Sequence, residues 1–124
     1  MAMAPCTATG TIRRHPDIAW HKTQADVARM ADLQGQLLRA ALDMLRPGGR
    51  LIYASCSLQP EEGPEVIERA LAQDSSVARV PITAAELPLP IDPTPEGDLR
   101  TLPCHLADRG GMDGFFIARL TKQA

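Results

Sequence analysis

At 124 residues the chain is long enough to bury one hydrophobic core and too short for two domains. Its formal net charge of −2 excludes a general attraction to nucleic acid or to anionic membranes, so any polyanion contact needs a local basic patch. No apolar run approaches the ~18 residues that span a bilayer, and three cysteines without a secretory leader indicate a reducing compartment. We therefore expect a soluble, cytoplasmic protein.

The first clear element in chain order is an amphipathic helix over residues 24–45. Residues 1–22 are rich in turn formers, and Thr23 can cap the helix that follows. Apolar residues then recur with a period near 3.6, which predicts one buried helix face. A cation, a proline and two glycines at residues 46–49 end the helix.

The segment "RLIYAS", residues 50–55, predicts a strand that is buried on both faces, which favours a parallel strand. A second helix is expected at about residues 62–72, with Val66, Ile67, Ala70 and Leu71 as its inner face. Strands are expected at 78–82 and 114–120. The many prolines and glycines in 83–113 predict a long irregular connection. This order predicts an α/β fold, in which ligands bind beyond the carboxyl ends of the strands.

Cys56 lies at that end of the first strand, within "YASCSLQPEEG". A thiol becomes a useful nucleophile as the thiolate, and a following helix N-terminus would lower its pKa. The alternative is a small buried residue that fills a gap in the core. We interpret Glu61 and Glu62 as first-turn carboxylates that stabilise the start of the second helix.

A second cysteine, Cys6, lies in "APCTATGTIRRHPD". Six residues separate it from Arg13, whereas phosphatase loops use five, so that match fails. The residues alone favour a buried or turn cysteine and a solvated basic pair, Arg13 and Arg14, with a phosphate contact as the alternative. No paired-ligand spacing such as C-x₂-C connects the cysteines and histidines, so we expect no metal site.

Three segments together resemble, in this order, the Nol/Nop/Sun (Sun/Fmu-like) family of RNA (cytosine-5) methyltransferases. They are "APCTATGTIRRHPDIAW", "LQGQLLRAALDMLRPGGRLIYASCSLQPEEG" and "RTLPCHLADRGGMDGFFIARL". The resemblance covers most of the chain except about residues 74–98. It implies a class I, Rossmann-like methyltransferase fold, S-adenosylmethionine as cofactor and RNA as partner.

The resemblance also implies a mechanism and a role for each motif residue. Cys56 would be the nucleophile that adds to carbon 6 of cytosine, and carbon 5 then takes the methyl group. Cys6 would assist release of the methylated product. Arg13, Arg14 and His15 would lie near the RNA backbone, and the target base would leave its stack to reach the thiol.

The chain also departs from the family pattern. The family places a glycine-rich cofactor loop and two acidic cofactor-binding residues upstream of the Pro-Cys motif, and Met3 stands where an aspartate is usual. Residues 1–124 therefore resemble one partial catalytic domain, the carboxyl-terminal half of the sheet with its flanking helices. We expect this polypeptide alone to be inactive and not to bind the cofactor appreciably.

Two further expectations follow from a partial sheet. The apolar strand at residues 51–55 would become an exposed edge, which favours a homodimer. The alternative to an enzyme is a non-catalytic α/β remnant that binds RNA or a protein partner.

Overall fold

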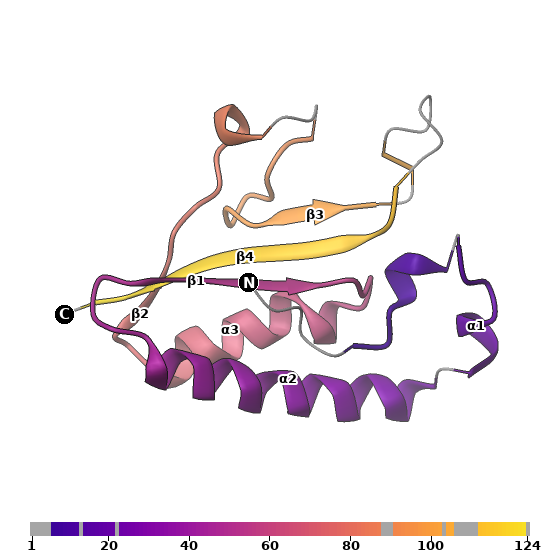
Figure 1. Cartoon of the computed structure of the whole chain (residues 1–124), viewed down its shortest axis with the longest axis horizontal. Coiled ribbons are helices and arrows are strands. Elements are labelled where there is room, and N and C mark those ends of the chain that lie inside the picture. The colour runs from indigo at the N-terminus through magenta and orange to yellow at the C-terminus, as the bar shows by residue number, and fades with distance from the viewer. Residues whose placement is uncertain are drawn as a thin grey trace.

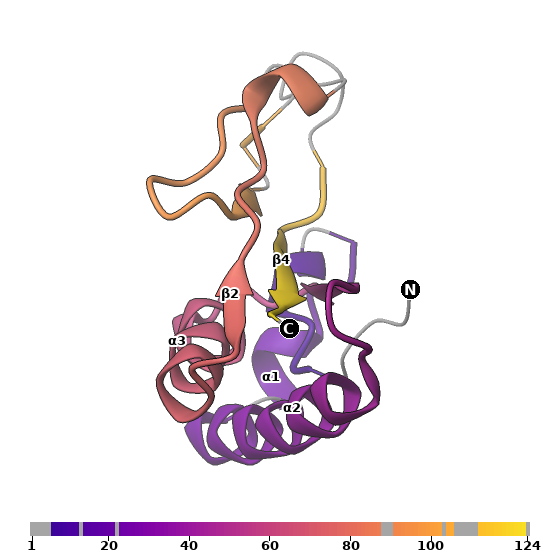
Figure 2. The same ribbon diagram turned by 90° about the vertical axis from the view of Figure 1, so that its left-hand side faces the viewer.

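The computed structural model describes residues 6–12, 14–21, 23–87, 91–102, 104–105 and 112–123. Two long helices lie side by side against one face of a small sheet (Figures 1 and 2). The helices are α2 (Gln24–Met44) and α3 (Pro64–Gln73), with the short α1 (Ile18–His21) before them. The strands are β1 (Arg50–Ser55), β2 (Val77–Arg79), β3 (Leu99–Thr101) and β4 (Phe115–Lys122), and the 3₁₀ turns are η1 (Thr9–Thr11), η2 (Pro60–Glu62) and η3 (Ala84–Glu86).

The sheet is built around β4, and every pairing in it is antiparallel. β1 pairs along one edge of β4, with Tyr53 opposite Ala118. β2 and β3 share the other edge, because β2 pairs with residues 120–122 of β4 and β3 with residues 115–117. β4 therefore pairs with each of the other three described strands.

The long helix predicted at residues 24–45 is confirmed as α2, and its start is capped as expected. The Thr23 hydroxyl accepts a hydrogen bond from the Asp26 N–H, and the Asp26 carboxylate accepts one from the Thr23 N–H. This reciprocal capping box satisfies two backbone donors that the first helical turn leaves without partners.

The sequence-based interpretation of β1 is wrong in two respects. β1 was expected to be a parallel strand buried on both faces, but it pairs antiparallel with β4 and its Ile52 side chain is 45% exposed. An apolar run indicates that a strand can be buried, but it does not determine whether the partner strand is parallel or antiparallel. β1 and β2 do run parallel to each other, because both are antiparallel to the β4 strand between them.

The connection predicted as irregular over residues 83–113 contains structure that the sequence reading missed. It includes η3 and the strand β3, which adds to the edge of β4. Arg100 of β3 donates to the Ser57 carbonyl oxygen at 2.7 Å, and its guanidinium lies over the Phe116 ring at 5.2 Å. β3 thus ties this connection to the loop that follows β1.

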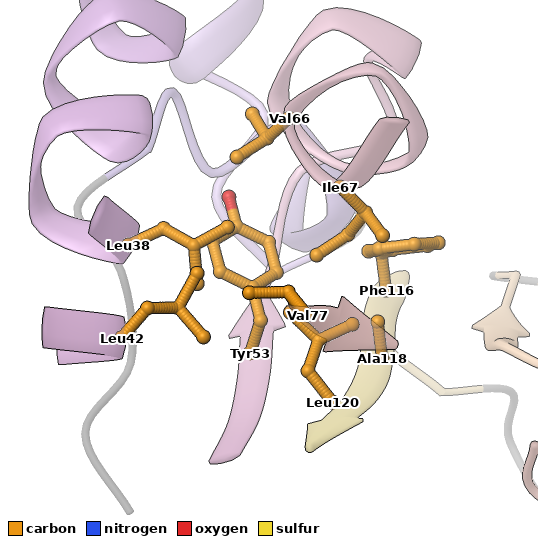
Figure 3. Close-up of a cluster of buried hydrophobic side chains, with 9 residues drawn as sticks. All are labelled: Leu38, Leu42, Tyr53, Val66, Ile67, Val77, Phe116, Ala118 and Leu120. Carbon is orange, nitrogen blue, oxygen red and sulfur yellow. The ribbon is translucent and has the colours of Figure 1, made fainter. Parts of the chain in front are cut away.

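The core lies between the two long helices and the sheet (Figure 3). Val66 and Ile67 of α3 are buried there, and Ala70 and Leu71 pack against the same cluster, as the helix periodicity predicted. The Tyr53 and Phe116 rings meet edge to face, with centroids 6.4 Å apart. Burial of each large apolar side chain contributes about 1.5–3 kcal/mol, so this cluster holds the helices on the sheet. The nine buried members are Leu38, Leu42, Tyr53, Val66, Ile67, Val77, Phe116, Ala118 and Leu120.

Within the described ranges, none of the helices combines the length and the apolar character needed to cross a membrane.

Candidate active site

Three loops meet at the carboxyl end of β1. The Gly10 N–H donates to the Cys56 carbonyl oxygen at 2.8 Å, and the Gly114 N–H donates to the Gly10 carbonyl oxygen at 2.7 Å. A Cβ atom on Gly10 would lie 2.0 Å from the Gly114 oxygen and 2.5 Å from the Cys56 oxygen. Only glycine allows this approach, so the Pro-Cys segment, the loop after β1 and the start of β4 are held together at Gly10.

The approach brings the two motif cysteines together. The Cys6 Sγ and Cys56 Sγ atoms lie 3.2 Å apart, and either thiol can donate a hydrogen bond to the other. The Ala8 N–H also points at the Cys6 Sγ, at 3.3 Å, where Ala8 adopts the left-handed conformation with φ 60°. Both cysteines are partly buried, whereas Cys104 is exposed.

The contact shifts the pKa values of the two thiols in opposite directions. The hydrogen bond from Cys56 lowers the pKa of Cys6 to about 6, against the opposing effect of burial. The same contact raises the pKa of Cys56, and burial and the negative charge of Cys6 add to that rise. We expected a helix N-terminus to lower the pKa of Cys56, and that expectation is wrong. α3 begins only at Pro64, and the neighbour that acts on Cys56 is another sulfur.

A fully buried carboxylate, Glu62, lies next to the residues that directly follow the two cysteines. Its two oxygens accept hydrogen bonds from the Thr7 N–H at 2.8 Å, the Thr7 hydroxyl at 2.6 Å, the Ser57 hydroxyl, and the Gln34 side-chain amide at 3.3 Å. The interpretation of Glu62 as a first-turn carboxylate therefore misses its main contacts. The available signal was the hydroxyl residues next to both cysteines, since hydroxyl groups need acceptors when they are buried.

The three basic residues proposed from the sequence as RNA contacts differ in what the structure shows of their surroundings. Arg14 pairs with Asp113 through its Nε and Nη2 atoms at 2.5–3.0 Å, and this carboxylate raises the pKa of Arg14. The Arg14 side chain is half exposed, whereas that of Asp113 is largely covered. His15 is exposed, and Arg13 lies outside the described residues.

Neither of two hollows among the described residues is suited to S-adenosylmethionine. One hollow, of about 880 Å³, is a groove between α2 and α3 lined by residues such as Asp32, Arg39 and Arg69. A smaller one, of about 290 Å³, lies between η1 and the start of α2. Neither is lined by a cysteine, and neither offers a glycine-rich loop next to a ribose-binding carboxylate. No three His, Cys, Asp or Glu side chains gather as metal ligands in the described part of the chain.

The chain has clear relatives among solved structures. NSun6 from Pyrococcus horikoshii, solved with SFG, superposes with a TM-score of 0.78 at 27% identity, over 99% of this chain and 29% of that one. A methyltransferase homologue from the same organism superposes with a TM-score of 0.70 at 34% identity, over 95% and 36%. The expected partial Rossmann-like methyltransferase fold is thereby confirmed.

The sequence comparisons agree. A protein named ribosomal RNA small subunit methyltransferase B from Pseudomonas syringae pv. tomato is 46% identical over 123 residues, which is 98% of this chain and 26% of that protein. A protein of the same name from Klebsiella pneumoniae is 42% identical over 120 residues, which is 97% and 25%. The chain thus spans about a quarter of the length of these curated relatives. Because residues 1–121 match the family described as 16S rRNA methyltransferase RsmB/F, the chain belongs to that methyltransferase family.

Proposed function

We propose that this chain carries the nucleophile of an S-adenosylmethionine-dependent RNA (cytosine-5) methyltransferase, with Cys56 attacking the base and Cys6 exchanging a proton with it. The observation that supports this assignment is the 3.2 Å contact between the two sulfurs at the carboxyl end of β1. Two thiols this close can share one proton, and a thiolate is the soft nucleophile that addition to a pyrimidine needs.

The proton balance of the pair gives both cysteines a function. As the Cys56 Sγ bonds to carbon 6 of cytosine, its proton passes to the Cys6 thiolate, and carbon 5 becomes electron-rich. S-adenosylmethionine supplies the methyl group in this family, and SFG in the relative is an analogue of it. A base then removes the proton from carbon 5, the carbon–sulfur bond breaks, and Cys6 returns its proton to the departing sulfur. The cycle ends with the thiolate again on Cys6, which accounts for a role of Cys6 in product release.

RNA is the expected partner because the family acts on rRNA. Arg14 and His15 are exposed beside the cysteine loops, and we propose them, together with Arg13, as contacts to the RNA backbone. Arg14 contributes here only if a phosphate competes with Asp113 for its guanidinium.

The nucleophile can be tested in a chimera in which this chain replaces the matched quarter of the Pseudomonas syringae relative. The chimera is incubated with cofactor and with small-subunit rRNA that contains 5-fluorocytosine. Release of the thiolate requires a base to remove a proton from carbon 5, and a base cannot remove a fluorine from that position. The protein–RNA adduct therefore persists and is visible on a denaturing gel. We expect an adduct from the parent chimera and from the matched control Cys104→Ser, and none from Cys56→Ser. With ordinary rRNA, Cys6→Ser should accumulate adduct, because the substitution removes the main cause of the raised pKa of Cys56, so attack continues, and it removes the proton donor for the departing sulfur. An adduct that survives Cys56→Ser would assign the nucleophile elsewhere, and a chimera that forms neither adduct nor 5-methylcytosine would favour a non-catalytic remnant.

We expect the 124 residues alone to be inactive, because neither of the two described hollows offers a glycine-rich loop next to a ribose-binding carboxylate. Calorimetry of the isolated chain with S-adenosylmethionine should show no binding in the micromolar range. Low-micromolar binding would contradict this expectation.

Self-association is the second partner proposal. Among the described residues, β1 pairs only with β4, so one of its edges has no partner strand there. An apolar edge of this kind favours pairing with another copy of the chain.

A further inference from the structure

Glu62 is the point at which three segments of the chain meet. Its carboxylate accepts four hydrogen bonds, from Thr7, Ser57 and Gln34, and the residue is completely buried. The Tyr53 hydroxyl in addition donates to the Glu62 carbonyl oxygen at 2.8 Å. The side chain and the backbone of Glu62 are therefore both held in place.

Two of these partners are the residues that directly follow the two cysteines. Thr7 follows Cys6, and Ser57 follows Cys56, so one carboxylate binds the chain immediately after each sulfur. Thr9 strengthens the same junction, because its Oγ1 lies 3.2 Å from the Ser57 Oγ and accepts from the Leu58 N–H at 2.8 Å. The contacts cross the 50 residues of chain that separate the two motifs.

We propose that Glu62 is a positioning residue that sets the distance between the Cys6 and Cys56 sulfurs. It contacts neither sulfur and acts through Thr7 and Ser57. The proposal rests on the proposed function, because the sulfur separation matters for catalysis only if the two thiols exchange a proton there.

A carboxylate suits this position better than its amide. Thr7 and Ser57 present donors to Glu62, and the Ser57 Oγ already accepts a hydrogen bond from the Gln59 N–H at 3.0 Å. In Glu62→Gln, one oxygen becomes an NH₂ donor that faces hydroxyl groups oriented to donate. A buried donor without an acceptor is unfavourable, so we expect the two loops to move apart.

The sulfur separation can be read from the pH profile of thiol alkylation in the isolated chain. The probe is iodoacetamide, and modification of Cys6 is followed by mass spectrometry of its peptide. In the parent chain the hydrogen bond from Cys56 holds the pKa of Cys6 at about 6. Glu62→Gln should move the midpoint of the profile up toward the value of about 8.5 of a free thiol. The matched control is Glu65→Gln, because Glu65 is exposed in the first turn of α3 and should leave the profile unchanged.

A purely structural role would lower the unfolding temperature and leave the profile of the folded chain in place. Unfolding is therefore followed by circular dichroism on the same samples. Ser57→Ala provides a second variant if Glu62→Gln does not fold, since it removes one of the four hydrogen bonds and should raise the midpoint by less. An unchanged midpoint in either variant, when folded, would overturn the proposal. No RNA is present in this assay, so its failure is distinct from failure of Cys56 in the trapping experiment.

Discussion

At the scale of single residues, the sulfur pair makes the stability of the chain depend on pH. The pKa of Cys6 is lowered by its contact with Cys56, so between about pH 6 and the ordinary thiol value the folded chain has released a proton that the unfolded chain retains. The free energy of unfolding should therefore rise across this range. The raised pKa of Cys56 has the opposite effect above the ordinary value, where stability should fall again.

Urea unfolding at a series of pH values checks this expectation. Cys6→Ser should flatten the rise that begins near pH 6, whereas Cys104→Ser should leave it in place because Cys104 is exposed. Equal slopes in the parent chain and in Cys6→Ser would show that the pair does not share a proton.

Gly10 provides a second prediction at this scale. A methyl group at this position would overlap the Gly114 and Cys56 carbonyl oxygens, so Gly10→Ala must push the three loops apart. We expect a loss of about 1–3 kcal/mol in the free energy of unfolding. Gly35→Ala is the matched control. Nothing lies within 4 Å of a Cβ there, and alanine should stabilise α2 by up to about 1 kcal/mol. Similar effects of the two substitutions in urea unfolding would contradict the close packing at Gly10.

At the scale of elements, the capping box at the start of α2 can be tested by one substitution. Thr23→Ala removes the side-chain acceptor for the Asp26 N–H, and it should lower the free energy of unfolding by about 1 kcal/mol. Thr23→Ser retains the hydroxyl and should lose much less. Thermal unfolding of the three proteins gives the comparison, and a Thr23→Ala variant as stable as the parent would show that water replaces the cap.

The elements also show what the sequence could predict and what it could not. α2 and α3 were predictable because their apolar residues repeat with the helical period, which is a local property. β3 was not, since three residues inside a segment rich in proline and glycine carry no periodic signal, and the strand forms by pairing with β4. The partner and direction of β1 depend on a strand that lies far along the chain.

The candidate site also contains features that the sequence could predict and features that it could not. The two cysteines could be singled out because their motifs resemble a known family, and the structure shows the two sulfurs in contact. The role of Glu62 could not be predicted from the sequence, because a glutamate in a first turn has the same local sequence pattern whether it faces solvent or a buried loop. The residues alone favour a solvated basic pair at Arg13 and Arg14, but Arg14 pairs with Asp113, which lies 99 residues away in the sequence.

At the scale of the whole molecule, the described surface has apolar side chains without a covering partner. Ile52 of β1 is exposed on the sheet, and Leu33, Leu37 and Met44 project from α2, with Met44 82% exposed. The spacing of the three α2 residues places them along one flank of the helix. Tyr53 of β1 faces the helices, so its neighbour Ile52 lies on the opposite face of the sheet, whereas the three α2 residues lie on the helical side. β1 also has an edge without a partner strand among the described residues.

We expect the surface formed by the free edge of β1 and the exposed apolar side chains on its two sides to bring two copies of the chain together. Light scattering at tens of micromolar should give the mass of a dimer, whereas Ile52→Lys combined with Leu37→Lys should give that of a monomer. The lysines place charges at positions that a twofold contact would bury, and such burial is costly without partners. Trp20→Lys is the matched control, because Trp20 is exposed but belongs to α1 and not to this surface. A monomeric parent chain would show that the apolar residues do not bind a second copy. A dimer that persists in the double variant would place the contact on another face, such as the groove between α2 and α3.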